Sequence, residues 1–253
     1  MPFLRLLRST VRSLWLMALL LSAVVDSLLR RPRTTHDGAV RVHVWCRRIT
    51  RAMGVDCSVE GAVPAYGAVV SNHLSYLDIL VFCSLRPFVM VAKSEVRRWP
   101  IIGRLAANAG TVFVMRGGGP PTWPGVNRAM AEAYCSGLPV LFFPEGTTTD
   151  GSTVLEFRRG LFHSVLNEGV PLNVAALRFS VTGRGASAAR DVCWWGDALL
   201  APHIFRLLGL DSVSAAIRFG AEVSEREDRF VLSQTARICI TKLAHIPEAV
   251  LPS

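Results

Sequence analysis

The chain has 253 residues, of which 51% are hydrophobic and 19% are charged, and its formal net charge is +9. This length allows one large domain with a substantial core, or such a domain with an appendage. Neither interleaved aromatic residues nor zinc-ligand spacing accompanies the basic charge, so no nucleic-acid partner is expected.

Most of the positive charge lies near the N-terminus, where residues 1–51 hold ten arginines against two aspartates, which leaves +8. Within this region, residues 14–25 form an apolar run. As a helix the run would be about 18 Å long, against roughly 30 Å of bilayer hydrocarbon. Because a basic excess beside an apolar run is attracted to anionic lipid, we expect a helix that lies in or dips into the membrane.

A second helix is predicted over residues 38–53, where Val42, Trp45, Ile49 and Met53 fall on one stripe and arginines lie elsewhere. The two helices predict a membrane-associating helical hairpin over residues 1–54. An ordinary helical hairpin packed on the core is the alternative.

From residue 55 the chain alternates between short apolar runs and helical stretches. The predicted strands cover residues 55–60, 68–71, 88–92, 111–115, 139–143, 172–177 and 215–219, and helices are predicted near 76–85, 95–108, 124–136 and 159–168. A last helix is predicted from Ser224, where Ser-Glu-Arg-Glu forms a possible capping box, towards His245. Strands separated by helices predict an α/β fold over residues 55–253, with a mostly parallel central sheet flanked by helices.

The stretch SNHLSYLDIL contains His73 and Asp78, five residues apart. On one regular helix these side chains would point about 140° apart, so they can meet only where the chain bends between a strand and a helix. One interpretation is a helix cap formed by Ser75 and Asp78, with His73 an incidental loop residue. The other is that Asp78 orients His73 as a general base.

No nucleophile of the GxSxG type occurs in the chain, which argues against an ordinary α/β-hydrolase. His73 and Asp78 also lack a third ligand at a recognisable spacing, so no metal site is expected. A base at His73 would therefore act on a hydroxyl of the substrate.

Two later blocks place polar residues after predicted strands. GTVFVMR ends in Arg116, and a guanidinium at the carboxyl edge of the sheet suits a phosphate or carboxylate, although a solvated arginine is equally consistent with the pattern. FPEGTTT brings Glu145 and Gly146 into a turn that could hold an anion, or that is simply a polar turn after a buried strand.

The ordered set NHLSYLD, GTVFVMR and FPEGTTT after a basic, apolar N-terminus resembles the glycerolipid acyltransferases, the 1-acylglycerol-3-phosphate acyltransferases and their lysophospholipid-acylating relatives. The resemblance covers residues 68–177, including the linking stretches 92–95, 100–103 and 157–160. It implies that His73 is the base and Asp78 its partner. It also implies that the acceptor head group is bound by residues of the second and third motifs, namely Gly110, Phe113, Arg116, Glu145, Gly146 and Thr147.

The resemblance further implies that an acyl group passes from acyl-CoA or acyl carrier protein to a lysophospholipid at the membrane surface, with no cofactor. The expected acceptor is 1-acylglycerol-3-phosphate, and the expected location is the cytoplasmic face of the inner (cell) membrane. The extension FPEGTTTDG and the later WWGD also resemble acyltransferases for lyso-ornithine lipid. The fourth family block departs from the pattern, because Val174 replaces its second proline. A catalytically inactive lipid-binding protein and a lipid hydrolase remain as alternatives of other classes.

Overall fold

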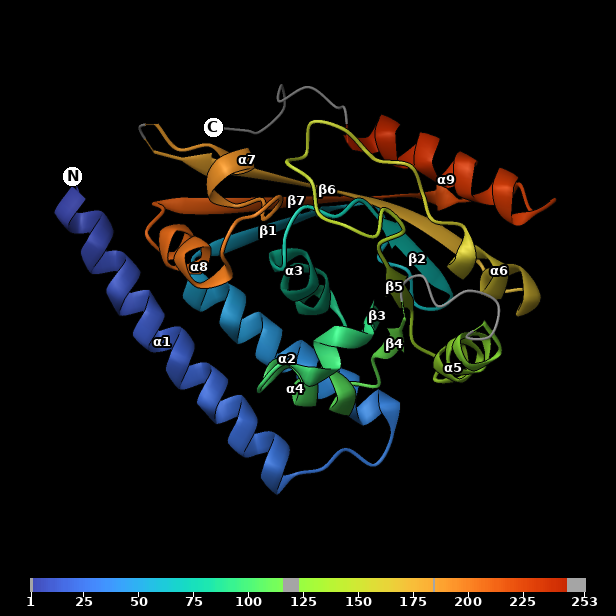
Figure 1. The fold of residues 1–253 in the computed structure, drawn as a ribbon, viewed down its shortest axis with the longest axis horizontal. Coiled ribbons are helices and arrows are strands. Elements are labelled where there is room, and N and C mark those ends of the chain that lie inside the picture. The colour runs from blue at the N-terminus through green and yellow to red at the C-terminus, as the bar shows by residue number, and fades with distance from the viewer. Residues whose placement is uncertain (1, 116–122, 184, 245–253) are drawn as a thin grey trace.

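A computed structural model describes residues 2–115, 123–183 and 185–244. The chain begins with two helices, α1 (Pro2–Leu29) and α2 (Thr35–Met53), which form a hairpin at one side of the molecule (Figure 1). Seven strands follow: β1 (Val55–Glu60), β2 (Ala68–Ser71), β3 (Val89–Lys93), β4 (Val112–Val114), β5 (Val140–Phe142), β6 (Leu172–Thr182) and β7 (Ser212–Glu222).

The strands form one sheet in the order β1-β7-β6-β2-β5-β3-β4. Every neighbouring pair is parallel except β6 and β7, which run antiparallel over most of their length. The predicted mostly parallel sheet flanked by helices is therefore confirmed. Strands β2, β3, β4, β5 and β6 run in the same direction, so the segments that follow them emerge at one carboxyl edge.

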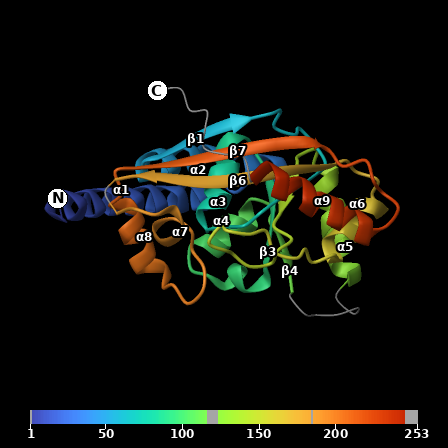
Figure 2. The same ribbon diagram turned by 90° about the horizontal axis from the view of Figure 1, so that it is seen from above.

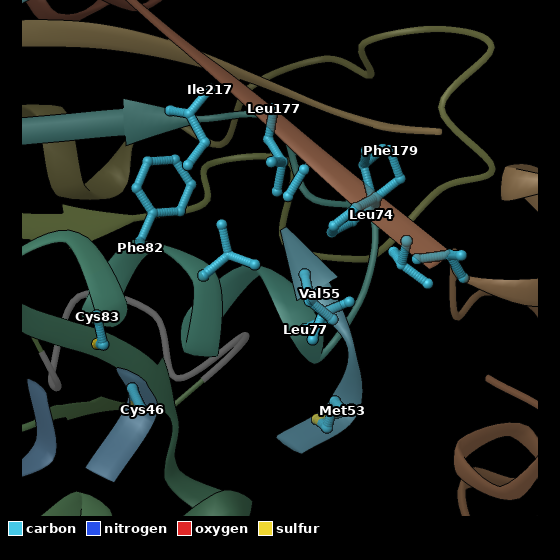
Figure 3. Close-up of a cluster of buried hydrophobic side chains, with 14 of the residues drawn as sticks. Cys46, Met53, Val55, Leu74, Leu77, Phe82, Cys83, Leu177, Phe179 and Ile217 are labelled. Carbon is cyan, nitrogen blue, oxygen red and sulfur yellow. The ribbon is translucent and has the colours of Figure 1, made fainter. Parts of the chain in front are cut away.

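Alternating side chains give the sheet an apolar surface on each face. Val69, Leu141 and Leu177 join one core cluster, and Val70 and Phe142 join the other. The first cluster is covered by α2, α3 (Leu77–Leu85) and α8 (Leu200–Leu208), and the second by α5 (Trp123–Cys135), α6 (Gly160–Asn167) and α9 (Arg229–Ala244). Figure 3 shows part of the first cluster, where Phe82 of α3 packs with Leu177 and Ile217 of the sheet.

The predicted helix over 95–108 is wrong in its continuity. The chain forms a 3-10 helix, η1 (Ser94–Arg98), and then a separate helix, α4 (Ile102–Asn108). Trp99 has extended backbone angles, as expected for the residue before Pro100. Proline thus divides what the apolar pattern suggested was one helix.

The predicted start of the last helix at Ser224 is also wrong. Helix α9 begins at Arg229, because the Asp228 carboxylate accepts hydrogen bonds from the backbone N–H groups of Phe230 (2.5 Å) and Val231 (2.9 Å). Asp228 therefore provides the cap that the sequence pattern assigned to Ser224. Residue 245, the predicted end, lies outside the described residues.

Helix α8 and the short helix α7 (Ala188–Asp191) were not predicted. Pro202 lies in the first turn of α8, where proline is tolerated because its missing N–H would have no partner. Strands β6 and β7 are also longer than predicted, since each continues into an antiparallel pairing that extends to Thr182 and Ser212.

Helix α1 lies along the side of the domain (Figure 2). It contacts the domain through residues in its first half and through residues near its end. In the first half of α1, Arg12 donates to the carbonyl oxygens of Leu208 (3.2 Å) and Leu210 (2.8 Å), at the C-terminal end of α8. Near its end, Asp26 accepts a hydrogen bond from the Trp45 indole of α2 at 3.1 Å. Arginines at the start of α1 therefore bind the domain, and the single acidic residue of α1 pairs with α2.

The opposite face of α1 is apolar and open. Residues 3–29 form the one helix among the described residues that is long and apolar enough to cross a membrane, yet only 11% of its most apolar window is buried. Leu7, Leu14, Leu21 and Leu28 recur every seven residues and are about half exposed or more. This spacing places them on one stripe of the helix surface.

Candidate active site

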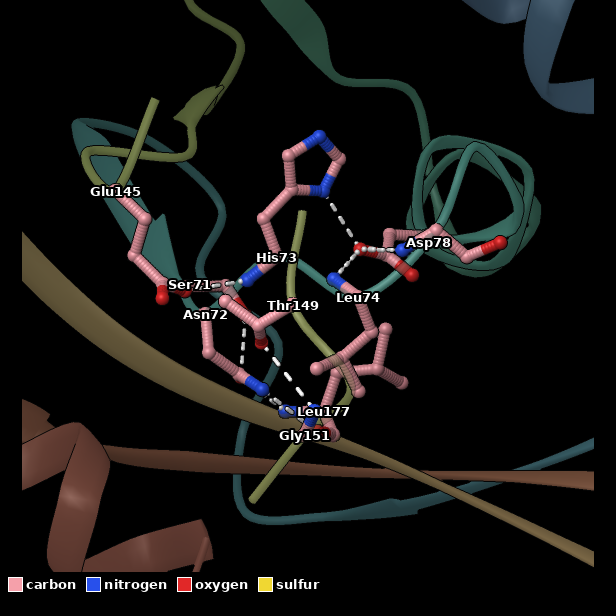
Figure 4. Close-up of polar contacts among 10 residues, drawn as sticks. Ser71, Asn72, His73, Leu74, Asp78, Glu145, Thr149, Gly151 and Leu177 are labelled. Atoms are coloured by element: carbon pink, nitrogen blue, oxygen red, sulfur yellow. Dashed lines mark hydrogen bonds and ion pairs between the residues drawn. The ribbon is translucent and has the colours of Figure 1, made fainter. Parts of the chain in front are cut away.

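His73 and Asp78 meet at the bend between β2 and α3. β2 ends at Ser71 and α3 begins at Leu77, so the two side chains lie on opposite sides of a short loop. The Nδ1 atom of His73 lies 2.7 Å from Oδ2 of Asp78 (Figure 4). The predicted contact between the imidazole and the carboxylate is therefore present in the structure.

The same Asp78 oxygen also accepts hydrogen bonds from the backbone N–H groups of Leu74 (2.6 Å) and Ser75 (3.0 Å). Asp78 is fully buried. Through these hydrogen bonds its carboxylate fixes the positions of both the loop backbone and the imidazole. The other interpretation, a helix cap formed by Ser75 and Asp78, is only half present. Asp78 accepts from the Ser75 backbone N–H, but the Ser75 hydroxyl has no hydrogen-bond partner among the described residues, and the N-cap position is Tyr76.

The His73 ring is fixed in one orientation. It stacks on Phe143, with ring centroids 4.1 Å apart and an interplanar angle of 8°. Because the Asp78 carboxylate can only accept, Nδ1 of the neutral imidazole carries the proton and Nε2 holds a lone pair. Nε2 points away from Asp78 in Figure 4, and the side chain is 18% exposed. The ring can therefore accept a proton from a molecule bound at the sheet edge.

Glu145 comes to the same loop from the end of β5. It is 4% exposed, and its oxygens accept hydrogen bonds from the backbone N–H groups of His73 (2.7 Å) and Leu155 (2.8 Å). Burial raises the pKa of Glu145 above its usual value, and these two hydrogen bonds oppose that rise. The structure thus brings Glu145 to His73, with its carboxylate engaged by the backbone.

The rest of the third motif surrounds this contact. Gly146 has φ +72°, a left-handed conformation that favours glycine, and the Arg158 side chain lies across it. Thr147 is exposed beside it, and Thr149 donates its backbone N–H to the His73 carbonyl at 2.9 Å. Gly146 and Thr147 therefore lie in the loop next to the imidazole.

The second motif is placed differently. Gly110 precedes β4, at the end of the strand opposite the carboxyl edge, and an added Cβ there would meet Thr35 of α2 at 2.4 Å. Phe113 lies within β4 and contacts the guanidinium of Arg97, at 5.6 Å from the ring centroid. Arg116 lies outside the described residues. The structure does not bring Gly110 to His73, and the substrate-binding roles of these three residues stay predictions.

Two features of the site were missed by sequence reasoning. The Asn72 side chain exchanges two hydrogen bonds with the backbone of Leu177, donating to its oxygen (2.9 Å) and accepting from its N–H (2.8 Å). The sequence signal that could have revealed this contact is an asparagine directly after a buried strand. The amide thereby extends the pairing of β2 with β6 by one step and fixes where the His73 loop begins.

The second missed feature is a buried contact from α8. His203 is 1% exposed; its Nε2 donates to the Cys193 carbonyl (3.0 Å), so its Nδ1 accepts from the Tyr76 hydroxyl (3.2 Å). The next residue, Trp194, donates its backbone N–H to the Leu74 carbonyl at 2.8 Å. No sequence pattern linked α8 to the loop, because the partners are far apart in the chain.

The chemistry of the site is that of an oriented base. Among the described residues, no three His, Cys, Asp or Glu side chains are grouped so that they could hold a metal ion. A cavity of about 550 Å³ lies elsewhere, between α1 and α4, and its lining includes Val24, Arg97 and Ile101 but not His73. The arrangement at the sheet edge can remove a proton from a hydroxyl presented to Nε2 of His73.

Comparisons with known proteins show which family this chain resembles. A family model described as Acyltransferase matches residues 59–176. The chain is 34% identical over 191 residues to the 1-acyl-sn-glycerol-3-phosphate acyltransferase of Neisseria meningitidis serogroup B, covering 74% of this chain and 73% of that protein. It is also 34% identical over 195 residues to the lyso-ornithine lipid O-acyltransferase of Pseudomonas aeruginosa, covering 76% and 74%.

Among solved structures, the 1-acyl-sn-glycerophosphate (LPA) acyltransferase PlsC of Thermotoga maritima has the same fold, with a TM-score of 0.71 over 98% of both chains at 15% identity. This likeness confirms the predicted architecture. The level of identity and coverage in the curated relatives confirms the predicted family. The chain is thus an O-acyltransferase of the lysophospholipid type and belongs to the glycerolipid acyltransferase family.

Proposed function

We propose that the protein transfers an acyl group from an acyl thioester, acyl-CoA or acyl carrier protein, to the free hydroxyl of 1-acylglycerol-3-phosphate, giving phosphatidic acid. The observation that carries this proposal is the 2.7 Å contact between Nδ1 of His73 and Asp78, which leaves Nε2 available to a substrate hydroxyl. The name of the Neisseria relative supports the choice of acceptor.

In the proposed reaction, Nε2 of His73 takes the proton as the acceptor oxygen attacks the thioester carbonyl. The tetrahedral intermediate then collapses, the C–S bond breaks, and the departing thiolate takes the proton from Nε2. Asp78 stabilises the imidazolium between these steps through its hydrogen bond to Nδ1. The acyl group passes directly between the substrates, so the reaction requires neither an acyl-enzyme nor a cofactor.

Glu145 contributes to this reaction through the backbone of His73. Both of its oxygens accept hydrogen bonds from backbone N–H groups, so it is a positioning residue in this mechanism. The exposed Thr147 and the neighbouring Gly146 remain candidates for contact with the acceptor head group.

We also propose that α1, with α2, holds the protein at the cytoplasmic face of the cell membrane, with residues 55–253 as the catalytic domain. One face of α1 binds the domain near both of its ends, while the opposite face exposes its leucines. A helix with this asymmetry suits the plane of the membrane interface better than a path across the bilayer. With α1 in this position, the His73 site would lie beside a lipid acceptor that is insoluble in water.

A second acceptor, lyso-ornithine lipid, has support of equal weight from the Pseudomonas relative, which matches at the same identity and similar coverage. The acyl-transfer chemistry at His73 would be unchanged. Only the recognition of the head group would differ.

The test measures free thiol released from acyl-CoA, and separately from acyl carrier protein, with each acceptor and without acceptor. We expect release that requires 1-acylglycerol-3-phosphate and falls at least about 100-fold in His73→Ala, since the base is lost. Turnover only with lyso-ornithine lipid would select the second acceptor. Retention of full turnover by His73→Ala would exclude His73 as the base, and thiol release without any acceptor would indicate a hydrolase.

A further inference from the structure

Arg158 lies over the third motif without a role in the contacts described so far. Its backbone N–H donates to the Pro144 carbonyl at 2.8 Å, so the segment that carries it is attached to the turn containing Glu145 and Gly146. Its side chain then crosses Gly146: an added Cβ at that glycine would lie 2.5 Å from Nε and 2.8 Å from Cδ of Arg158. The absence of a side chain at Gly146 therefore allows the guanidinium to approach the loop.

The other arginines around this segment have partners. Arg159 points to α9, where its guanidinium lies 4.6 Å from the centroid of the Phe230 ring. Arg237 donates to Leu155 at 3.0 Å and pairs with Glu156 at 2.7 Å. Among the described residues, no carboxylate pairs with Arg158, and its side chain is exposed. The Arg158 guanidinium is thus available to bind a ligand beside the loop that carries His73.

The position of this cation matches the chemistry of a phosphate-bearing acceptor. Glu145, the residue before Gly146, binds the backbone N–H of His73 at 2.7 Å, so Arg158 and the imidazole approach the same loop from neighbouring positions. In 1-acylglycerol-3-phosphate the reacting hydroxyl and the phosphate are on adjacent carbons. A hydroxyl presented to His73 therefore brings the phosphate close to the same loop, and the planar guanidinium of Arg158 can pair with two phosphate oxygens.

We propose that Arg158 binds the anionic head group of the acceptor and makes the site selective for a phosphate. The proposal rests on the proposed acyl transfer and adds to it a residue that recognises the acceptor. Lyso-ornithine lipid carries a carboxylate together with an ammonium group, so its head group offers less net negative charge to the same cation.

The test compares Arg158→Gln with Arg159→Gln, a matched variant of the adjacent arginine that points to α9. We expect Arg158→Gln to raise KM for 1-acylglycerol-3-phosphate about 10- to 100-fold with little change in kcat, because charge-assisted hydrogen bonds to the phosphate are lost. Arg158→Lys should recover part of the loss, since it restores the charge without the paired geometry. Arg159→Gln should leave KM unchanged.

The neutral acceptor 1-acylglycerol, which lacks the phosphate, separates recognition from structure. If Arg158 binds the phosphate, Arg158→Gln leaves KM for the neutral acceptor unchanged. An equal rise in KM for both acceptors, an equal loss in Arg159→Gln, or no change in KM for the phosphate acceptor would each overturn the assignment.

A binding measurement keeps the two proposals distinguishable. Calorimetry on His73→Ala protein without an acyl donor, so that no transfer occurs, should show binding of 1-acylglycerol-3-phosphate that weakens about tenfold or more when Arg158→Gln is added. Equal affinities would contradict the role of Arg158 while leaving the proposed acyl transfer untouched. A wild-type protein that binds this lipid through Arg158 but transfers no acyl group to it would contradict the proposed function alone.

Discussion

At the scale of single residues, the site depends on two buried carboxylates that bind backbone N–H groups. Asp78 holds Leu74, Ser75 and the His73 ring, and Glu145 holds the backbone of His73. Neither side chain needs to touch substrate to matter. Each determines where Nε2 of His73 points, which is the property that proton transfer requires.

Glu145→Gln tests this positioning role. A glutamine keeps one acceptor oxygen, so the backbone N–H of either His73 or Leu155 would face an amide NH₂ in a buried site. We expect the free energy of unfolding to fall by about 1–3 kcal/mol and kcat to fall with it. Chemical denaturation and steady-state kinetics measure the two effects.

The matched control is Glu156→Gln, which removes a carboxylate that is exposed and pairs with Arg237 on the surface. That change should cost less than about 1 kcal/mol. A Glu145→Gln protein as stable and active as this control would contradict the positioning role.

At the scale of elements, the loop that carries His73 is held against α8 by the buried contact of Tyr76 with His203. Burial lowers the pKa of His203, so the folded protein binds a proton there less readily than the unfolded chain. The free energy of unfolding should therefore fall as the pH drops below about 6.5.

His203→Gln removes this titration while keeping an amide donor for Cys193 and an amide acceptor for Tyr76. Between pH 7 and 5, we expect its free energy of unfolding to fall less steeply than that of wild type, by up to about 1.4 kcal/mol per pH unit. Denaturation curves at several pH values measure the difference. Parallel pH profiles of the two proteins would contradict this account of His203.

The limits of sequence prediction also become clear at the scale of elements. Strands β1 and β2 occupy the predicted residues: β1 (VDCSVE) alternates apolar and polar residues directly after Gly54, and β2 (AVVS) is a short apolar run directly after Gly67. Helix α8, which has Pro202 in its first turn, was not predicted, and the division of η1 from α4 at Pro100 was missed. Local proline rules depend on position within an element, which the apolar pattern alone did not define.

In the site, the pairing of His73 with Asp78 was predictable because they are five residues apart, with His73 in the loop after β2 and Asp78 in the first turn of α3. The contact of Glu145 with His73 joins residues 72 positions apart and depends on the register of β5 against β2. The contact of Arg158 with Gly146 arises because the loop after β5 folds back on itself, with the Arg158 backbone N–H bonded to the Pro144 carbonyl. Such contacts follow from tertiary packing, for which the sequence offers no periodic signal.

At the scale of the whole molecule, α1 presents an apolar stripe on one side and polar anchors on the other. The double variant Leu14→Glu/Leu21→Glu places two charges on that stripe, at side chains that are 68% and 54% exposed. We expect it to bind phospholipid vesicles at least about tenfold more weakly, because burial of both leucines in lipid is lost. Co-flotation with vesicles measures the binding.

Val59→Glu is the control, since Val59 is also exposed but lies on β1, away from α1. It should bind vesicles as wild type does, and the thermal midpoint should confirm that each variant is folded. Unchanged vesicle binding by the Leu14→Glu/Leu21→Glu protein would contradict a membrane role for α1.

The two anchors of α1, Arg12 on α8 and Asp26 on α2, have a consequence for how lipids would be handled. A helix held to the domain at two points cannot rotate away from it. The sheet edge that carries His73 would therefore keep a constant distance and tilt relative to the lipid surface. Each acceptor would then enter from, and each product return to, the same leaflet. Bilayer sidedness would thus be preserved through every turnover, and moving the product to the opposite leaflet would require a separate flippase.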